Sequence, residues 1–300
     1  MRGRGNGNPP EGMTATPRRC PLCGSSGETV LTSTVRQVLD GNAGYLPEHR
    51  AEFDRITGLD TRVTVARCRS CGFHFGGEAP DDELLAYDYG VVNTTDVSRK
   101  RVYEVDRRRI RVEIWAKLLA LYTKPLEDVR AVDFGCGWGD VLAMIRSPGV
   151  SVIGVEQNET QVAFARAHGV EVRADVSEIE PASVDFVLAN QVLEHVADPR
   201  AVLTSLRRLM RDGALAFFSV PDFSRFDWKS AQRTVDSGGS ITRLVNPWEH
   251  LNYFDRRSFA CLLEETGFRP EPASLRDRAE TAARLALRRA TGIEAYCRGD

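Results

Sequence analysis

The chain has no long apolar stretch and no large excess of either charge. No apolar run approaches the ~20 residues that a membrane-spanning helix needs, and residues 1–17 hold no apolar segment like that of a secretion signal. The sequence therefore predicts a cytoplasmic protein with no membrane association. The formal net charge is -2 at pH 7, so the whole molecule offers no general attraction for nucleic acid, and we expect no nucleic-acid partner.

Cysteine is too sparse, and the expected compartment too reducing, for a disulfide framework. The seven cysteines therefore indicate metal binding or chance. With 42% hydrophobic and 27% charged residues, most of the chain should fold. Its 300 residues can form one large α/β domain and a small second module. Residues 1–17, which are rich in Gly, Asn and Pro, are predicted to form a disordered leader.

Four of the cysteines form two C-x-x-C pairs, each followed by glycine. Cys20 and Cys23 lie in CPLCG, and Cys68 and Cys71 lie in CRSCG. Such a turn directs two thiolates at one point, and two turns complete a tetrahedral S4 site for Zn²⁺. Because a closed S4 site has no open position, the zinc would be structural. The alternatives are a redox pair or two unrelated C-x-x-C sequences.

The zinc-binding domain is expected to span residues 18–92. The 44 residues between the two pairs require an inserted loop or hairpin around residues 40–60. Apolar residues 63–66 and 73–75 look like strands that hold the second pair. His74 could compete as a ligand, but four cysteines already satisfy zinc, so we favour an ordinary strand residue.

A long amphipathic helix is expected after this domain. Apolar residues recur at helical spacing from Val97 to Tyr122, inside a predicted linker helix over residues 93–126. Its arginine-rich face could contact a phosphate-bearing substrate or RNA. A solvated face, partly paired with acidic side chains, is the interpretation we favour.

Residues 127–300 alternate between strand and helix patterns. The pattern predicts an α/β fold, a Rossmann-like, mainly parallel sheet of seven strands with ligands at the carboxyl ends of its strands. The expected strands are residues 131–134, 152–155, 170–173, 184–189 and 214–220, a short extended piece after Phe268, and residues 293–298. The expected helices are residues 141–146, 159–168, 199–210 and 275–290, and one that Asp255 caps and Gly267 ends.

A glycine-rich loop, VDFGCGWGD, follows the first of these strands. Gly135, Gly137 and Gly139 allow the backbone to turn sharply and approach a ligand. Glu156 ends the second strand, where a carboxylate can accept both hydroxyls of a ribose. The dinucleotide fingerprint needs glycine where this chain has Asp140, so nicotinamide cofactors are disfavoured. The loop and the acid together predict an adenosine site.

Four segments, VDFGCGWGD, VIGVEQNE, ASVDFVLANQVLEHVADP and WEHLNYFDRRSFACLLEETGF, resemble successive motifs of class I S-adenosylmethionine-dependent methyltransferases. The resemblance covers residues 127–300. It implies that Asp133 and the glycine loop hold the methionine portion of the cofactor, Glu156 the ribose and Asp175 the adenine amino group. The implied cofactor-binding residues are Asp133, Gly135, Cys136, Gly137, Gly139, Glu156, Gln157, Asp175, Val176, Asn190 and Gln191.

The paired cysteines before such a domain resemble the zinc-binding leader of certain sugar and natural-product methyltransferases, which implies a small-molecule acceptor. Ubiquinone-type O-methyltransferases, in contrast, carry an acidic residue three positions before the Glu-His of LEHV and use it to bind a divalent metal. This chain has Gln191 there. We therefore expect no catalytic metal at Glu194 and His195, which would only organise the turn after the fourth strand.

The catalytic candidates lie after the fifth strand, where an acceptor pocket should be lined. His250 is the first choice for a general base; the competing interpretation is that it bonds a backbone carbonyl and fixes its loop. Tyr253 and His195 are the reserve candidates. Four aromatic side chains could form an apolar wall or simply pack in the core: Phe223, Phe226, Trp228 and Trp248.

The sequence therefore predicts a small-molecule methyltransferase in secondary metabolism or sugar modification. An RNA methyltransferase that grips its substrate with the zinc module is the alternative enzyme. A zinc-stabilised binding module without activity is the alternative from another class. The acceptor atom and the oligomeric state stay open.

Overall fold

The chain forms two units, each of which is built from two separate segments of the sequence. The computed structural model describes residues 13–92, 125–139, 142, 149–270 and 292–299. Unit 1 comprises Met1–Asn93 and Asp227–Leu251, and unit 2 comprises Thr94–Phe226 and Asn252–Asp300. We expected residues 227–251 to belong to the methyltransferase domain. They belong instead to unit 1, because their apolar side chains Val245 and Trp248 are buried in its core.

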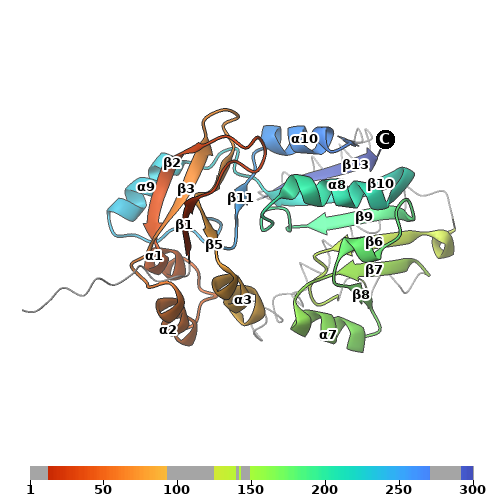
Figure 1. Ribbon diagram of the computed structural model, residues 1–300, viewed down its shortest axis with the longest axis horizontal. Coiled ribbons are helices and arrows are strands. Elements are labelled where there is room, and N and C mark those ends of the chain that lie inside the picture. Colours follow the sequence, from red (N-terminus) through yellow and green to blue (C-terminus); the bar gives the residue numbers. More distant parts are fainter. Residues whose placement is uncertain (1–12, 93–124, 140–141, 143–148, 271–291, 300) are drawn as a thin grey trace, which may run out of the picture. The chain divides into compact units, whose positions relative to one another are not determined.

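Unit 2 is built on one seven-stranded sheet, as expected (Figure 1). Its order is β12 (Phe268–Pro270), β13 (Gly292–Gly299), β10 (Met210–Pro221), β9 (Val184–Asn190), β6 (Arg130–Phe134), β7 (Ser151–Val155) and β8 (Glu171–Arg173). All run parallel except β13, which is antiparallel to both of its neighbours. This confirms the prediction of a Rossmann-like, mainly parallel sheet, and the carboxyl ends of β6, β7 and β9 lie at one edge.

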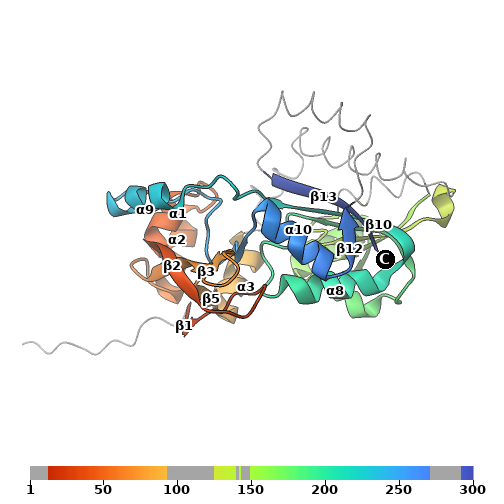
Figure 2. The same ribbon diagram turned by 90° about the horizontal axis from the view of Figure 1, so that it is seen from above.

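The helices of unit 2 begin where the sequence supplies a cap. They are α7 (Glu159–Ala167), α8 (Pro199–Leu209) and α10 (Arg256–Glu265), with short 3-10 turns η2 (Leu126–Asp128) and η3 (Val176–Glu178). The Asp198 carboxylate accepts from the backbone N–H of Ala201 at 2.9 Å, and Pro199 fills the first turn of α8, where it costs no hydrogen bond. In Figure 2, α8 and α10 lie on the same face of this sheet.

The core of unit 2 lies between the sheet and its helices. Every residue of β9 except Asn190 is buried, as a strand with both faces covered requires. Phe186 and Phe217, from the neighbouring strands β9 and β10, belong to one buried cluster with Leu142 and Val170. Full burial of each such side chain contributes about 1.5–3 kcal/mol. This core fixes the strand ends that carry the glycine loop.

Unit 1 contains a smaller antiparallel sheet in which β3 (Arg62–Cys68) lies between β2 (Gly27–Thr34) and β4 (His74–Gly76). The strands expected at residues 63–66 and 73–75 are therefore present, with His74 on β4. Unit 1 also contains β5 (Glu78–Pro80), α1 (Val35–Asp40), α2 (Pro47–Ile56), α3 (Asp82–Gly90) and α9 (Trp228–Asp236). The short β11 (Asn252–Tyr253) follows the return of the chain to unit 2.

Two N-terminal expectations are corrected. Residues 13–17 are not a disordered leader but form β1 (Met13–Pro17), which pairs antiparallel with β5 and so gains backbone hydrogen bonds that a leader would lack. The insertion around residues 40–60 is not a loop or hairpin. It contains α2, which starts at Pro47 and buries Phe53 and Ile56, three residues apart on one helical face.

Helix α9 covers the edge strand of the unit 1 sheet. The Gln232 side chain accepts from the backbone N–H of Thr32 at 2.7 Å and donates to its carbonyl at 3.2 Å. The amide thus satisfies both backbone groups of one residue on β2, which would otherwise be an open edge. This pairing ties the inserted segment to the N-terminal part of unit 1.

Several predicted elements lie outside the described residues: most of the leader, the linker helix over residues 97–122, nearly all of the helix over residues 141–146, and the helix over residues 275–290. Among the helices that are described, none has the length and hydropathy to cross a membrane.

Candidate functional site

Three glycines shape the loop after β6, and each has a left-handed backbone. Gly135, Gly137 and Gly139 have φ angles of 71°, 58° and 68°. A Cβ on Gly135 would lie 2.6 Å from Cγ2 of Val192, and one on Gly139 would lie 2.9 Å from the Cβ of Ala165. A Cβ on Gly137 would meet no atom of the described residues within 4 Å. The outer glycines thus permit close packing, whereas the middle one opens onto space that a ligand can occupy.

Backbone hydrogen bonds hold this loop against the end of β7. The N–H groups of Gly135 and Cys136 donate to the Val155 carbonyl at 2.9 and 3.2 Å. The Cys136 side chain is buried, and a Cβ on Gly154 would approach its sulfur to 2.5 Å. Cys136 therefore belongs to the loop through its backbone, while its thiol fills the core.

The Glu156 carboxylate is oriented by three backbone N–H groups. Its Oε2 accepts from Gly137 at 3.0 Å, and its Oε1 accepts from Gln157 and Asn158 at 2.8 and 2.9 Å. A carboxylate has about four lone-pair sites, so capacity remains for further donors such as hydroxyl groups. The acid thus lies at the carboxyl end of β7, next to the glycine loop, as the sequence predicted.

The other predicted cofactor residues lie along the same strand ends. Asp133 is buried on β6, one residue before its last. Asp175 is exposed just after β8 and caps η3 by accepting from the N–H of Ser177 at 2.8 Å. These hydrogen bonds lower the pKa of Asp175 below its ordinary value. Gln157 is exposed and Val176 is half-buried.

A polar chain joins the ends of β9 and β10. The Gln191 side-chain N–H donates to the Ser219 hydroxyl at 3.2 Å, and that hydroxyl donates to Oδ1 of Asn190. Gln191 has a φ angle of 57°, a conformation that non-glycine residues adopt mainly where the surrounding structure enforces it. Sequence reasoning missed Ser219. No local sequence signal identifies it, because its pairing with Asn190 depends on the register of two adjacent parallel strands.

The turn after β9 is held by Asn252. Its side-chain N–H groups donate to the carbonyls of Leu193 and Val196 at 2.9 and 2.7 Å. Within this turn Glu194 is buried, and one of its oxygens lies 3.8 Å from Nε2 of the half-buried His195. The bonds from Asn252 hold the backbone of the turn, and the role expected for Glu194 and His195 stays a prediction.

His250 lies in unit 1 at the end of the inserted segment. Its Nδ1 is 2.8 Å from the carbonyl oxygen of Leu244. Because a carbonyl can only accept, Nδ1 carries the proton, and the lone pair of the neutral ring is on Nε2. The competing sequence interpretation, a bond to a backbone carbonyl, is therefore present, and the role of His250 as a base stays a prediction.

The four aromatic side chains that were expected to form a wall do not all belong to the same unit. In unit 2, Phe223 is buried with its ring centroid 5.5 Å from that of Phe226 and 5.1 Å from that of the buried Tyr253. In unit 1, Trp248 is 1% exposed, so it packs in the core. Trp228 stacks on His74 with centroids 4.9 Å apart. His74 is thus engaged outside the cysteine cluster.

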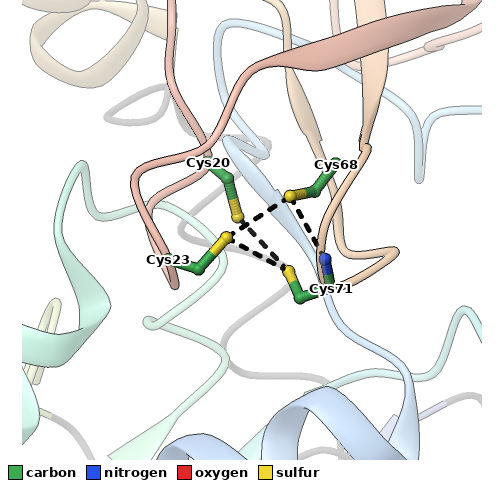
Figure 3. Close-up of side chains that lie close together, drawn as sticks. All are labelled: Cys20, Cys23, Cys68 and Cys71. Carbon is green, nitrogen blue, oxygen red and sulfur yellow. Dashed lines mark hydrogen bonds between the residues drawn. The ribbon is translucent and has the colours of Figure 1, made fainter.

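The four cysteines of the N-terminal pairs converge in unit 1, as Figure 3 shows. The sulfur atoms of Cys20 and Cys71 are 3.6 Å apart, those of Cys23 and Cys68 3.4 Å, and those of Cys23 and Cys71 3.7 Å. A disulfide would need about 2.05 Å, so the thiols are free. Four sulfurs at these separations can surround one metal ion.

The turns that present these cysteines depend on glycine. Gly24 and Gly72 have φ angles of 72° and 78°, and their N–H groups donate to the carbonyls of Cys20 and Cys68 at 2.8 and 3.1 Å. The N–H of Cys71 also donates to the Cys68 sulfur at 3.5 Å. Each glycine thus closes a tight turn that directs its two sulfurs toward the other pair.

The thiols differ in acidity. Hydrogen bonding, first from Ser25, lowers the pKa of the exposed Cys23 to about 6. Burial raises the pKa of Cys71 to about 11 and raises that of Cys20 further. A cation among the four sulfurs would favour the thiolate form of all of them.

A family model described as "Methyltransferase domain" matches residues 105–272, more than half of the chain. Among curated proteins, the ubiquinone biosynthesis O-methyltransferase of Hahella chejuensis is 34% identical over 101 residues, which cover 30% of this chain and 42% of that protein. The protein of the same name from Erwinia tasmaniensis is 26% identical over 155 residues, or 46% of this chain and 64% of that protein. The matches thus span about half the length of these relatives.

Solved structures of similar proteins include an S-adenosylmethionine-dependent methyltransferase from Mesorhizobium loti. It is 19% identical with a TM-score of 0.43, and the match covers 61% of this chain and 96% of that one. Another is the geranyl diphosphate C-methyltransferase of Streptomyces coelicolor A3(2), which is 16% identical with a TM-score of 0.42 over 66% of this chain and 82% of that one.

Proposed function

This chain belongs to the methyltransferase domain family that matches it, and on that premise we propose that it transfers a methyl group from S-adenosylmethionine to a small-molecule acceptor by in-line displacement. The observation that carries the proposal is the space over Gly137, where a Cβ would have no neighbour within 4 Å in the described part of the chain, beside the oriented carboxylate of Glu156. The names of the curated relatives, which are enzymes of ubiquinone biosynthesis, support a small acceptor. A natural product or a sugar intermediate in secondary metabolism fits the same proposal.

The cofactor would lie across the carboxyl ends of the central strands. Glu156 would accept hydrogen bonds from the ribose hydroxyls, Asp133 and the glycine loop would hold the methionine portion, and Asp175 would bind the adenine amino group. Gln157 and Val176 would border the nucleoside, and Asn190 and Gln191 the methionine portion or the acceptor. S-adenosylmethionine supplies an electrophilic methyl group on a sulfonium sulfur.

The residues of the chain contribute mainly by positioning. Holding two reacting groups at ~3 Å in a water-poor site can lower a barrier by several kcal/mol. The bond from the His250 Nδ1–H to Leu244 supports His250 as the general base, because its Nε2 could accept a proton from the acceptor. Such a base contributes about 10²–10⁴-fold. Tyr253 is buried against Phe223 and His195 lies beside Glu194, so both rank after His250.

The cysteine cluster fits a structural Zn²⁺ ion. A tetrahedral site with Zn–S bonds of about 2.3 Å places its sulfurs about 3.8 Å apart. Three sulfur pairs here are 3.4 to 3.7 Å apart, and all four sulfurs lie within 4.8 Å of one another. Cys20, Cys23, Cys68 and Cys71 would be its ligands and would close the coordination sphere. We place the protein in the cytoplasm, where these thiols stay reduced.

Calorimetry with S-adenosylhomocysteine tests the cofactor assignment. We expect the wild-type protein to bind it and Glu156→Ala to bind at least about tenfold more weakly. Glu159→Ala is the matched control, because Glu159 is an exposed acid three residues away in the first turn of α7. Equal binding by Glu156→Ala and the wild type, or no binding by the wild type, would remove the assignment.

A further inference from the structure

A buried hydrogen-bond network in unit 1 centres on the hydroxyl of Tyr45. The hydroxyl donates to Oδ1 of Asp88 on α3 at 2.8 Å. It accepts from the side-chain N–H of Asn246 at 2.9 Å and from the indole N–H of Trp248 at 3.2 Å. All four side chains are less than a tenth exposed. The network therefore joins the N-terminal part of unit 1 to the inserted segment before His250.

The direction of each bond in this network is fixed by chemistry. Trp248 and the amide N–H of Asn246 can only donate, so the Tyr45 oxygen must accept from both and give its single proton to Asp88. The phenol is thus fully used, with one donor and two acceptor positions occupied. A phenylalanine at position 45 would remove all three bonds at once and would leave the buried groups of Asp88, Asn246 and Trp248 without this partner.

The network continues through the backbone to His250. The Asn246 carbonyl accepts from the N–H groups of Glu249 and His250 at 3.1 and 2.7 Å. The Asn246 side chain also donates to a Glu249 carboxylate oxygen at 3.0 Å. The turn that begins at Asn246 therefore ends at the residue whose ring donates to Leu244 at 2.8 Å. Tyr45 holds the first residue of this turn in place.

We propose that Tyr45 is a positioning residue for His250. By holding Asn246 and Trp248, it maintains the turn that brings the Leu244 carbonyl to Nδ1 of the ring and keeps the lone pair on Nε2. The inference rests on the proposed function for its importance, because His250 is the residue that we propose as the general base. The unit would then do more than carry a structural zinc ion.

The aromatic ring of Tyr45 and its hydroxyl have separable roles. The ring packs against Phe53, with centroids 5.1 Å apart, and phenylalanine preserves that contact. Tyr87 offers a matched control. Its ring packs against the same Phe53 at 5.5 Å, and its hydroxyl makes no hydrogen bond to any residue that the structure describes. Tyr87→Phe therefore removes a hydroxyl from the same cluster without touching the network.

The test is the tautomer of His250, read by long-range proton–nitrogen NMR on the full-length, zinc-loaded protein. The chain has only five histidines, and His250→Gln assigns the signal. We expect the wild type and Tyr87→Phe to show the Nδ1–H tautomer when the ring is neutral. Tyr45→Phe should shift the signal toward a mixture that contains the Nε2–H form. An unchanged His250 signal in Tyr45→Phe would overturn the proposal.

A milder variant covers the case in which Tyr45→Phe does not fold. Trp248→Phe removes a single donor from the network and should shift the tautomer in the same direction by a smaller amount; no shift in this variant would also contradict the proposal. Failure of the proposed function is distinguishable, because the tautomer is read without turnover. A wild-type protein that does not bind S-adenosylhomocysteine loses its enzymatic assignment, while the NMR comparison still decides the role of Tyr45.

Discussion

The backbone N–H of Gly137 donates to Oε2 of Glu156 across 3.0 Å, which joins the middle of the glycine loop to the end of the neighbouring strand. The carboxylate is held there by two further N–H groups, those of Gln157 and Asn158. These three bonds fix the positions of the loop and the acid relative to each other. Such preorganisation reduces the ordering cost of binding.

Substitution of Gly137 by alanine should weaken cofactor binding for a local reason. The added methyl group enters the open space that we assign to the cofactor, and we expect S-adenosylhomocysteine affinity to fall at least about tenfold by calorimetry. Gly213→Ala is the control, because Gly213 also has a left-handed φ, 73°, and its Cβ position has no described atom within 4 Å. Both variants carry a backbone cost of about 1–2 kcal/mol, so equal losses of affinity would contradict the assignment.

Substitution of an outer glycine of the loop should lower stability, whereas substitution of the middle glycine should lower cofactor affinity. Gly135→Ala should destabilise unit 2, because its Cβ would lie 2.6 Å from Cγ2 of Val192. Val192→Ala removes both methyl groups that obstruct it, so the double variant should regain part of the lost stability in urea unfolding. The left-handed φ of 71° at Gly135 would still cost about 1–2 kcal/mol. Strictly additive effects of the two substitutions would contradict the steric explanation.

Zinc should bind with a stoichiometry of one ion per chain, measured by elemental analysis of the purified protein. Cys68→Ser should lose the metal and destabilise unit 1, because binding free energy of structural zinc, about 10 kcal/mol or more, is also folding free energy. Cys261→Ser should keep the metal, since Cys261 is an exposed cysteine on α10. Full zinc content in Cys68→Ser would show that the cluster is not the site.

Stability should fall as pH rises because of one buried acid. Burial raises the pKa of Asp88 well above its ordinary value, whereas an unfolded aspartate titrates near about 3.9. Between those two values the folded chain keeps a proton that the unfolded chain releases. Unfolding free energy should therefore decrease through this window, by up to about 1.4 kcal/mol per pH unit.

Asp88→Asn isolates this contribution. The amide oxygen can still accept from Tyr45, but the side chain does not titrate. Urea unfolding at several pH values measures the free energy of unfolding of both proteins. The value for Asp88→Asn minus the value for the wild type should rise with pH. Charged and titratable neighbours, Glu249 and Tyr45, are common to both proteins. A difference that stays constant with pH would show that Asp88 is ionised in the folded chain.

The elements of unit 2 could be predicted from the sequence because local signals mark them. The strand expected at residues 131–134 is β6 (Arg130–Phe134), and the helix expected at residues 199–210 is α8 (Pro199–Leu209). Glycine turns and the Asp198 cap fix their ends. The positions of Glu156 and the glycine loop at strand ends followed from the same signals.

Non-local contacts explain what could not be predicted. Trp248 and Tyr45 are 203 residues apart in sequence and share a hydrogen bond, and no local pattern near Trp248 indicates which core it enters. The Asn190–Ser219 contact depends on strand register. In α2, the apolar spacing of Phe53 and Ile56 was present, but the loop or hairpin was inferred only from the 44 residues between the two cysteine pairs.

Because unit 1 is discontinuous in sequence, its second segment is synthesised long after its first. A ribosome must make both C-x-x-C turns and then β6, β7 and β9 before Trp248 emerges and can pack against Phe53. The nascent N-terminal module therefore waits, with part of its apolar interior exposed, for a segment made some 200 residues later. A fragment that ends at residue 93 would keep all four cysteines but would lack the inserted segment, residues 227–251, that completes unit 1.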